Sequence, residues 1–207
     1  VFKQYGIKVD FQPIDWSMKE TELKNGTIDL LWNGYSVNAS RRKKVAFSRY
    51  YLANRQVLVT LKRDHINNLN DMQGKTLGVQ TGSTGDTVLN EHPKLLKDKI
   101  KGKAPVMYDT FPNAFIDLNA GRIQGILMDE VYANYYVKHQ KNPADYRVEV
   151  NRQFPVEYFA VGMRKGDKTL RKKINNGLGR LQRNGQLKKI NEKWFGTNST
   201  FLGPDNN

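Results

Sequence analysis

The feature that most constrains this 207-residue chain is a regular alternation of short apolar runs with segments of helical spacing. Three apolar runs of strand length are each followed by a segment in which apolar residues recur every three or four positions: 76–80 by 86–96, 105–109 by 111–121, and 123–129 by 130–141. Strands that alternate with helices at this interval predict an α/β fold with mainly parallel sheets.

The two ends of the chain carry the same alternation in a less regular form. The run IDLLW is almost wholly apolar, as in a strand covered on both faces, and two glycines stand where helices are expected to end. We expect the end of a helix at 1–6, strands at 7–14, 28–32 and 158–163, and helices at 17–26 and from Leu170 to Trp194.

Composition narrows the classes of function. The formal net charge of +14 would suit a polyanionic partner, but it is spread along the chain without a zinc-finger or RNA-recognition signature. We therefore interpret it as a basic, solvated surface and expect no nucleic acid to be bound. The chain has no cysteine, which excludes disulfides and thiolate chemistry, and its three histidines are scattered among polar neighbours. We expect no metal and no cofactor.

Polar residues gather where three of the predicted strands end. Ligands of open α/β sheets lie beyond the carboxyl ends of the strands. Ser83 and Thr84, at a predicted helix start, could bind an anion such as a carboxylate or simply cap the helix. Asp129 could bind a cation or cap the helix that follows. The residues at the three strand ends are Asn33 to Ser36, Thr81 to Gly85, and Asp129 with Glu130.

A run of four basic residues, from Arg41 to Lys44, follows the first of these strand ends. We expect Arg42, Lys43 and Lys44 to be solvated. Arg41 lies nearest the strand-end loop and could offer its planar guanidinium to a carboxylate through two parallel hydrogen bonds. Combined with the other two strand ends, this predicts a site for one small zwitterion. Arg41, Ser83 and Thr84 would bind the carboxylate, and Asp129 would bind the ammonium group.

Four ordered motifs carry a resemblance to a known family. The first is a spacing of five residues: Gly34, Ser36 two positions later, Arg41 seven after Gly34, and Phe47 with Ser48 six after Arg41. The others are LGVQTGSTG, GILMDE and a closing segment from FAVGMRKGDK to EKWFG. Over nearly its whole length the sequence resembles the amino-acid-binding proteins of bacterial ABC importers, the solute-binding family for polar amino acids.

The resemblance implies a periplasmic-binding-protein-like fold of two lobes that close like a hinge around a free polar L-amino acid. Lobe 1 would comprise residues 1–54 and 158–207, lobe 2 residues 55–157, and the hinge residues 51–55 and 153–157. The closed form would deliver the amino acid to a membrane permease and would perform no catalysis. The resemblance also implies an extracytoplasmic location at the cell surface or in the periplasm, with a signal segment and a lipid anchor.

The same resemblance assigns ligand-binding residues to each lobe. Trp16 stands where family members often place an aromatic ring against the ligand side chain, whereas Trp32 is interpreted as core. Further candidates for contact with the ligand side chain are Asn54, Gln56, Gln80, Met128 and Glu157. The lobe 1 set is Asn33, Gly34, Ser36 and Arg41, and the lobe 2 set is Ser83, Thr84 and Asp129.

One departure from the family pattern and two alternatives stay open. Family members have a strand, a pocket loop and a full first helix ahead of the position of Val1. We therefore expect lobe 1 to lack its N-terminal strand and part of its first helix, either because the chain was shortened or because it is a naturally abbreviated copy. If these elements are truly absent, we expect weakened binding, a displaced strand or exchange between chains. Prephenate and arogenate dehydratases resemble these binding proteins, and Glu20 or Glu157 would then be the general acid. The third possibility is a nucleic-acid binder attracted by the positive charge.

Overall fold

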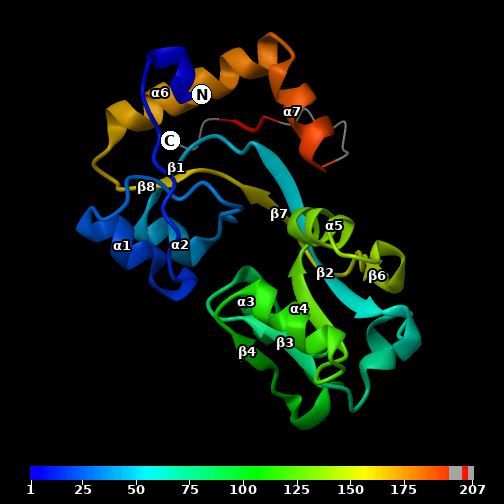
Figure 1. The fold of residues 1–207 in the computed structure, drawn as a ribbon. Helices are drawn as coiled ribbons and strands as arrows, with labels where there is room; N and C mark the ends of the chain where they lie inside the picture. Colours follow the sequence, from blue (N-terminus) through cyan, green and yellow to red (C-terminus); the bar gives the residue numbers. More distant parts are fainter. Residues whose placement is uncertain (196–201, 205–207) are drawn as a thin grey trace. The chain divides into compact units, whose positions relative to one another are not determined.

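The computed structural model describes residues 1–195 and 202–204, and its chain divides into two compact units (Figure 1). Unit 1 consists of Val1–Asn54 and Val156–Asn207, and unit 2 of Arg55–Pro155. Strands and helices occur in both units, so the expected α/β class is confirmed. Gly196, the last residue of the expected closing segment, lies outside the described residues.

Unit 2 is built on a mixed sheet with the strand order β4-β3-β5-β2-β6. β3 pairs in parallel with β4 and β5, but β2 is antiparallel to both β5 and β6. The expectation of mainly parallel sheets is therefore wrong for β2. This strand begins in unit 1 and does not come from a strand–helix–strand repeat, so the sequence periodicity could not give its direction. The strands are β2 Leu52–Leu61, β3 Leu77–Gln80, β4 Val106–Tyr108, β5 Gly125–Asp129 and β6 Tyr146–Glu149.

Both faces of this sheet are covered by apolar side chains. Val57 and Val59 of β2 belong to one buried cluster, and Leu58 between them belongs to the other, because successive side chains of a strand point to opposite faces. The first cluster receives side chains from α4 and α5, and the second from α3. The helices are α3 Thr84–Glu91, α4 Phe111–Asn119 and α5 Glu130–Lys138.

The described residues of unit 1 form a smaller sheet and four α-helices. β1 pairs with β8 in antiparallel fashion, and single bridges join Leu31 to Gly162 and Ser36 to Phe159. Helix α6 lies beside the N-terminal 3-10 helix, where Gln4 donates a hydrogen bond to the carbonyl of Gly177 (Figure 1). The elements are α1 Lys19–Asn25, α2 Ala39–Lys44, β1 Ala46–Phe47, β7 Val156–Phe159, β8 Gly162–Met163, α6 Lys168–Arg183 and α7 Gln186–Phe195.

For unit 1, two expectations are wrong and a third is confirmed only in part. Residues 7–14 form no strand; Ile7, Val9 and Phe11 are exposed, Phe11 to 94%, and only Ile14 packs partly against the core of unit 1. Alternation favours a strand only where a partner strand and a core face exist. Residues 28–32 contribute a single bridge at Leu31 instead of a strand, and residues 158–163 split between β7 and β8. In contrast, Gly6 and Gly26 end their helices in the left-handed conformation, as predicted.

The remaining elements are short, and none of the helices in residues 1–195 and 202–204 has the length and apolarity that a membrane span requires. The 3-10 helices are Phe2–Tyr5, Trp16–Met18, Lys62–Asp64, Leu69–Met72, Lys101–Lys103 and Pro143–Asp145.

Candidate functional site

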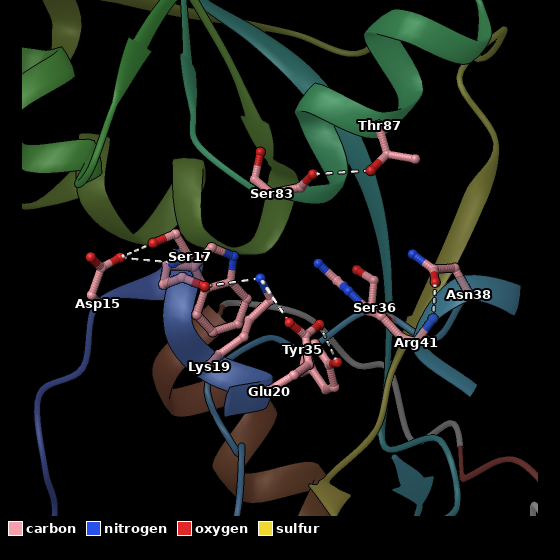
Figure 2. Close-up of polar contacts among 11 residues, drawn as sticks. Asp15, Ser17, Lys19, Glu20, Tyr35, Ser36, Asn38, Arg41, Ser83 and Thr87 are labelled. Atoms are coloured by element: carbon pink, nitrogen blue, oxygen red, sulfur yellow. Dashed lines mark hydrogen bonds and ion pairs between the residues drawn. The ribbon is translucent and has the colours of Figure 1, made fainter. Parts of the chain in front are cut away.

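Arg41 stands out from the basic run because the fold buries it. The side chain of Asn38 accepts a hydrogen bond from the backbone N–H of Arg41 at 2.8 Å and so starts helix α2 (Figure 2). Arg41 is 6% exposed, and its Nη1 donates to the carbonyl of Ser36 at 2.8 Å. Its guanidinium carbon lies 4.5 Å from the ring centroid of Tyr35. The Ser36 carbonyl therefore holds one edge of the guanidinium, and the Tyr35 ring packs against it.

The other three basic residues of α2 are exposed. Arg42 donates to the hydroxyl of Tyr50 at 2.7 Å and lies 5.9 Å from the ring centroid of Phe47. A helix turns about 100° per residue, so neighbours in a four-residue run point in different directions. The run is thus one buried arginine and three surface charges.

Tyr35 forms the support beneath this guanidinium and was not singled out as a site residue from the sequence. Its side chain is fully buried and stacks on Phe47, with ring centroids 5.4 Å apart. Its hydroxyl donates to Glu20 Oε1 at 2.9 Å (Figure 2). Burial raises the pKa of the Tyr35 phenol far above its usual value, so it stays a hydrogen-bond donor. The indole of Trp16 meets the same ring edge-on at 5.9 Å.

Ser36 links Arg41 to a buried carboxyl group. Its carbonyl accepts from Arg41, as described, and its Oγ donates to Glu157 Oε2 at 2.6 Å. Asn54 Nδ2 also donates to this Glu157 oxygen, at 3.4 Å. Glu157 is 8% exposed and comes from the distant half of unit 1, 121 residues further along the chain. Ser36 therefore bonds to the Arg41 cation through its carbonyl and to the carboxyl group of Glu157, on β7, through its hydroxyl.

Gly34 allows this loop to turn. Its φ of 82° is in the left-handed region, and an added Cβ would lie 3.4 Å from the Phe159 ring. A residue with a side chain would be strained there. Asn33, the residue before it, is exposed.

In unit 2, Ser83 and Thr84 lie at the start of α3. Ser83 Oγ accepts from the backbone N–H of Asp86 at 3.2 Å, and the Ser83 carbonyl accepts from Thr87 Oγ1 at 3.3 Å (Figure 2). Ser83 is 4% and Thr84 9% exposed. Ser83 thus caps the helix, one of the two roles that the sequence allowed.

Asp129 ends β5 and occupies the position before α5, yet its side chain makes no capping hydrogen bond. Its Oδ1 accepts instead from Gln56 Nε2 at 3.0 Å, across the antiparallel pair β2–β5. The capping interpretation of Asp129 is therefore wrong. The carboxylate is half-buried at the end of a strand, where it can accept hydrogen bonds from an ammonium group.

Lys19, at the start of α1 in unit 1, is a further charged residue close to Arg41, and its residue type and spacing provided no reason to select it. It is 3% exposed, and burial lowers its pKa from 10.5 to about 8. Nearby Glu20 raises this pKa, while Arg41 and Lys44 lower it. A lysine within a strongly polar helix is ordinarily solvated, which is why the sequence pattern gave no signal.

The remaining sequence candidates lie as follows. Trp32 packs among apolar neighbours of unit 1, in contact with Phe2 and Tyr51, as its interpretation as core requires. Gln80 donates to the carbonyl of Asp109, and Met128 is buried in the core of unit 2. The three histidines are exposed. Within residues 1–195 and 202–204, no group of three or more histidine, aspartate or glutamate side chains is arranged to hold a metal ion.

Comparison with known proteins gives consistent matches. The family model described as "Bacterial extracellular solute-binding proteins, family 3" matches residues 1–197. An arginine-binding protein of an ABC transporter from Escherichia coli K12 is 32% identical over 177 residues, 84% of this chain and 68% of that protein.

Two solved structures of streptococcal proteins are more similar in sequence. An ABC uptake transporter substrate-binding protein from Streptococcus pneumoniae with bound histidine is 49% identical, with a TM-score of 0.90 over 95% of this chain and 80% of that chain. A polar amino acid ABC uptake transporter substrate-binding protein from Streptococcus thermophilus is 53% identical, with a TM-score of 0.59 over 95% of this chain and 74% of that chain.

Proposed function

This chain belongs to family 3 of the bacterial extracellular solute-binding proteins, and we propose that it captures a free polar amino acid for an ABC importer. The observation that supports the proposal most directly is the burial of Arg41 and the fixed position of its guanidinium. A single arginine out of four consecutive basic residues is buried, stacked on Tyr35 and anchored to the Ser36 carbonyl. Such a guanidinium is preorganised to bind one carboxylate through two parallel hydrogen bonds.

The proposed roles follow the chemistry of each group. Arg41 binds the ligand carboxylate, with the N–H groups and hydroxyls at the start of α3, Ser83 and Thr84, as further donors. Asp129 accepts hydrogen bonds from the ligand ammonium group. Trp16 provides an apolar wall for the ligand side chain. Asn33, Gly34 and Ser36 shape the loop that carries Arg41.

We propose that units 1 and 2 are the two lobes and that residues 51–55 and 153–157 are the hinge. A ligand that contacts both lobes has a higher affinity for the closed form and shifts the population towards it. The closed form is then the one that the membrane permease binds. We further propose that the protein works outside the cytoplasm and is held at the membrane by a lipid.

The ligand class is a polar amino acid. Histidine and arginine are the first to test, because one similar protein was solved with bound histidine and another is named as an arginine-binding protein. The dehydratase alternative gains no specific support. Its two candidate general acids, Glu20 and Glu157, both accept hydrogen bonds, from Tyr35 and Ser36.

The test is isothermal titration calorimetry with pairs of ligands that differ by one carboxylate. L-histidine is compared with histamine and L-arginine with agmatine, and L-lysine, L-glutamine and L-cystine complete the panel. At least one amino acid should bind with a Kd on the order of 1 μM or tighter. Its decarboxylated partner should bind at least about 100-fold more weakly, because two charge-assisted hydrogen bonds contribute about 3 kcal/mol or more. Absence of binding by the whole panel, or equal binding of an amine, would contradict the proposal.

A further inference from the structure

Lys19 is a buried ammonium group in a helix whose other charged residues are at least partly exposed. Withdrawing a lysine from water is unfavourable unless its charge finds partners. Its Nζ donates to the carbonyl of Trp16 at 2.9 Å and lies 4.9 Å from the centroid of the Trp16 indole (Figure 2). It also lies 3.8 Å from Glu20 Oε2. One side chain thus contacts the backbone and the ring of the same tryptophan.

The carboxylate beside Lys19 continues this set of contacts towards Arg41. Glu20 Oε1 accepts from the Tyr35 hydroxyl at 2.9 Å, and the Tyr35 ring lies 4.5 Å from the Arg41 guanidinium carbon. The same ring meets Trp16 edge-on. Lys19, Glu20 and Tyr35 therefore connect the two residues of unit 1 that the proposed function places against the ligand, Trp16 and Arg41.

We propose that Lys19 is a positioning residue of the amino-acid site: its charged form holds Trp16 and the Glu20–Tyr35 pair in the arrangement that supports Arg41. This inference rests on the proposed function for its meaning, but the contacts that it invokes exist without ligand. Loss of the proton removes the charge that lies over the indole and the attraction to Glu20. The position of Trp16, and through it the affinity for the ligand, then depends on pH.

The charged groups that act on Lys19 come from three segments. Glu20 on α1 and Asp15 before the first turn of that region favour its charged form, whereas Arg41 and Lys44 on α2 disfavour it. Burial is the largest influence, and together these effects lower the pKa of Lys19 to about 8. The group therefore changes charge within the accessible pH range, unlike an ordinary lysine.

The first test needs no ligand and uses Trp16 as its own reporter. In a Trp32→Phe, Trp194→Phe background, Trp16 is the only tryptophan, since the chain has three. Its fluorescence, excited at 295 nm, is followed from pH 6.5 to 9.5. We expect a transition with a midpoint near pH 8. Lys19→Met should abolish it, Lys19→Arg should keep the low-pH signal throughout, and Lys24→Met, an exposed lysine of the same helix, should leave it unchanged.

The second test measures the Kd of L-histidine by calorimetry at pH 7. Lys19→Met should weaken binding about five- to tenfold, as expected for loss of roughly one hydrogen bond, and Lys24→Met should have no effect. A flat fluorescence profile in the parent overturns the proposal, and so does an unchanged Kd in Lys19→Met. If the fluorescence transition is present but no amino acid binds, the proposed function is wrong while the contacts of Lys19 with Trp16 are supported.

Discussion

Lys19→Met should make the protein more stable at neutral pH, although it removes a hydrogen bond. The pKa of Lys19 is lowered from 10.5 to about 8 in the folded chain, so between these values the unfolded chain binds more protons. Stability then rises with pH through that window, and the full cost of the buried charge is present below it. At about 1.4 kcal/mol for each tenfold change, this cost is roughly 3 kcal/mol at pH 7 and under about 1 kcal/mol at pH 10.

The assay is urea unfolding followed by tryptophan fluorescence, which reports on unit 1 because Trp16, Trp32 and Trp194 all belong to it. The free energy of unfolding of the parent, minus that of Lys19→Met, should increase by about 2 to 3 kcal/mol from pH 7 to pH 10. Other groups titrate in both proteins and cancel in the difference. A difference that stays constant, or falls, over this range would refute the account of the buried charge.

Two further predictions concern the other polar groups of the site. Ser36→Ala should lower the free energy of unfolding by about 1–3 kcal/mol, because Glu157 loses a buried hydrogen-bond donor. Ser40→Ala, at an exposed serine, should change this free energy by less than about 0.5 kcal/mol. Equal effects of the two variants in urea unfolding would contradict this prediction. Asp129→Asn should weaken L-arginine binding about tenfold or more in calorimetry through loss of a charged acceptor, while the exposed Asp145→Asn should not.

The sequence was sufficient to predict the strands and helices that alternate regularly in unit 2. Strands β3, β4 and β5 and helices α4 and α5 lie where the spacing of apolar residues predicted them, and α3 does so as far as Glu91 but not to residue 96. The spacing fails for residues 7–14, where the alternation is present but Ile7, Val9 and Phe11 remain exposed. It also fails for the direction of β2, because direction depends on which strands become neighbours and not on the residues of the strand itself.

In the candidate site, too, only the features that depend on local sequence could be predicted. Gly34 and the cap at Ser83 follow from local backbone chemistry, which short sequences encode. The bond between Ser36 and Glu157 joins positions 121 residues apart, so no local pattern could reveal it. Lys19 is buried, with its amino group bonded to the Trp16 carbonyl and close to Glu20, and a basic residue in a polar helix gives no sign of that.

Lys19 also illustrates how stability and function separate in this protein. A methionine at this position would avoid the cost of burying a charge, yet the charge is what contacts Trp16 and Glu20. Residues that lower stability while ordering a binding site are expected at functional positions. The predicted gain in stability and the predicted loss in affinity for Lys19→Met are therefore two consequences of one buried ammonium group.

The most direct test of the central claim compares two neighbouring arginines. Calorimetric titrations of L-histidine and L-arginine are made with Arg41→Ala, Arg41→Lys and Arg42→Ala, and circular dichroism checks that each variant is folded. Both Arg41 variants should lose at least about 100-fold in affinity, since lysine keeps the charge but not the planar pair of donors. Arg42→Ala should bind within about twofold of the parent, because exposed charges contribute little. Equal losses at the two positions, or full affinity in Arg41→Ala, would contradict the account.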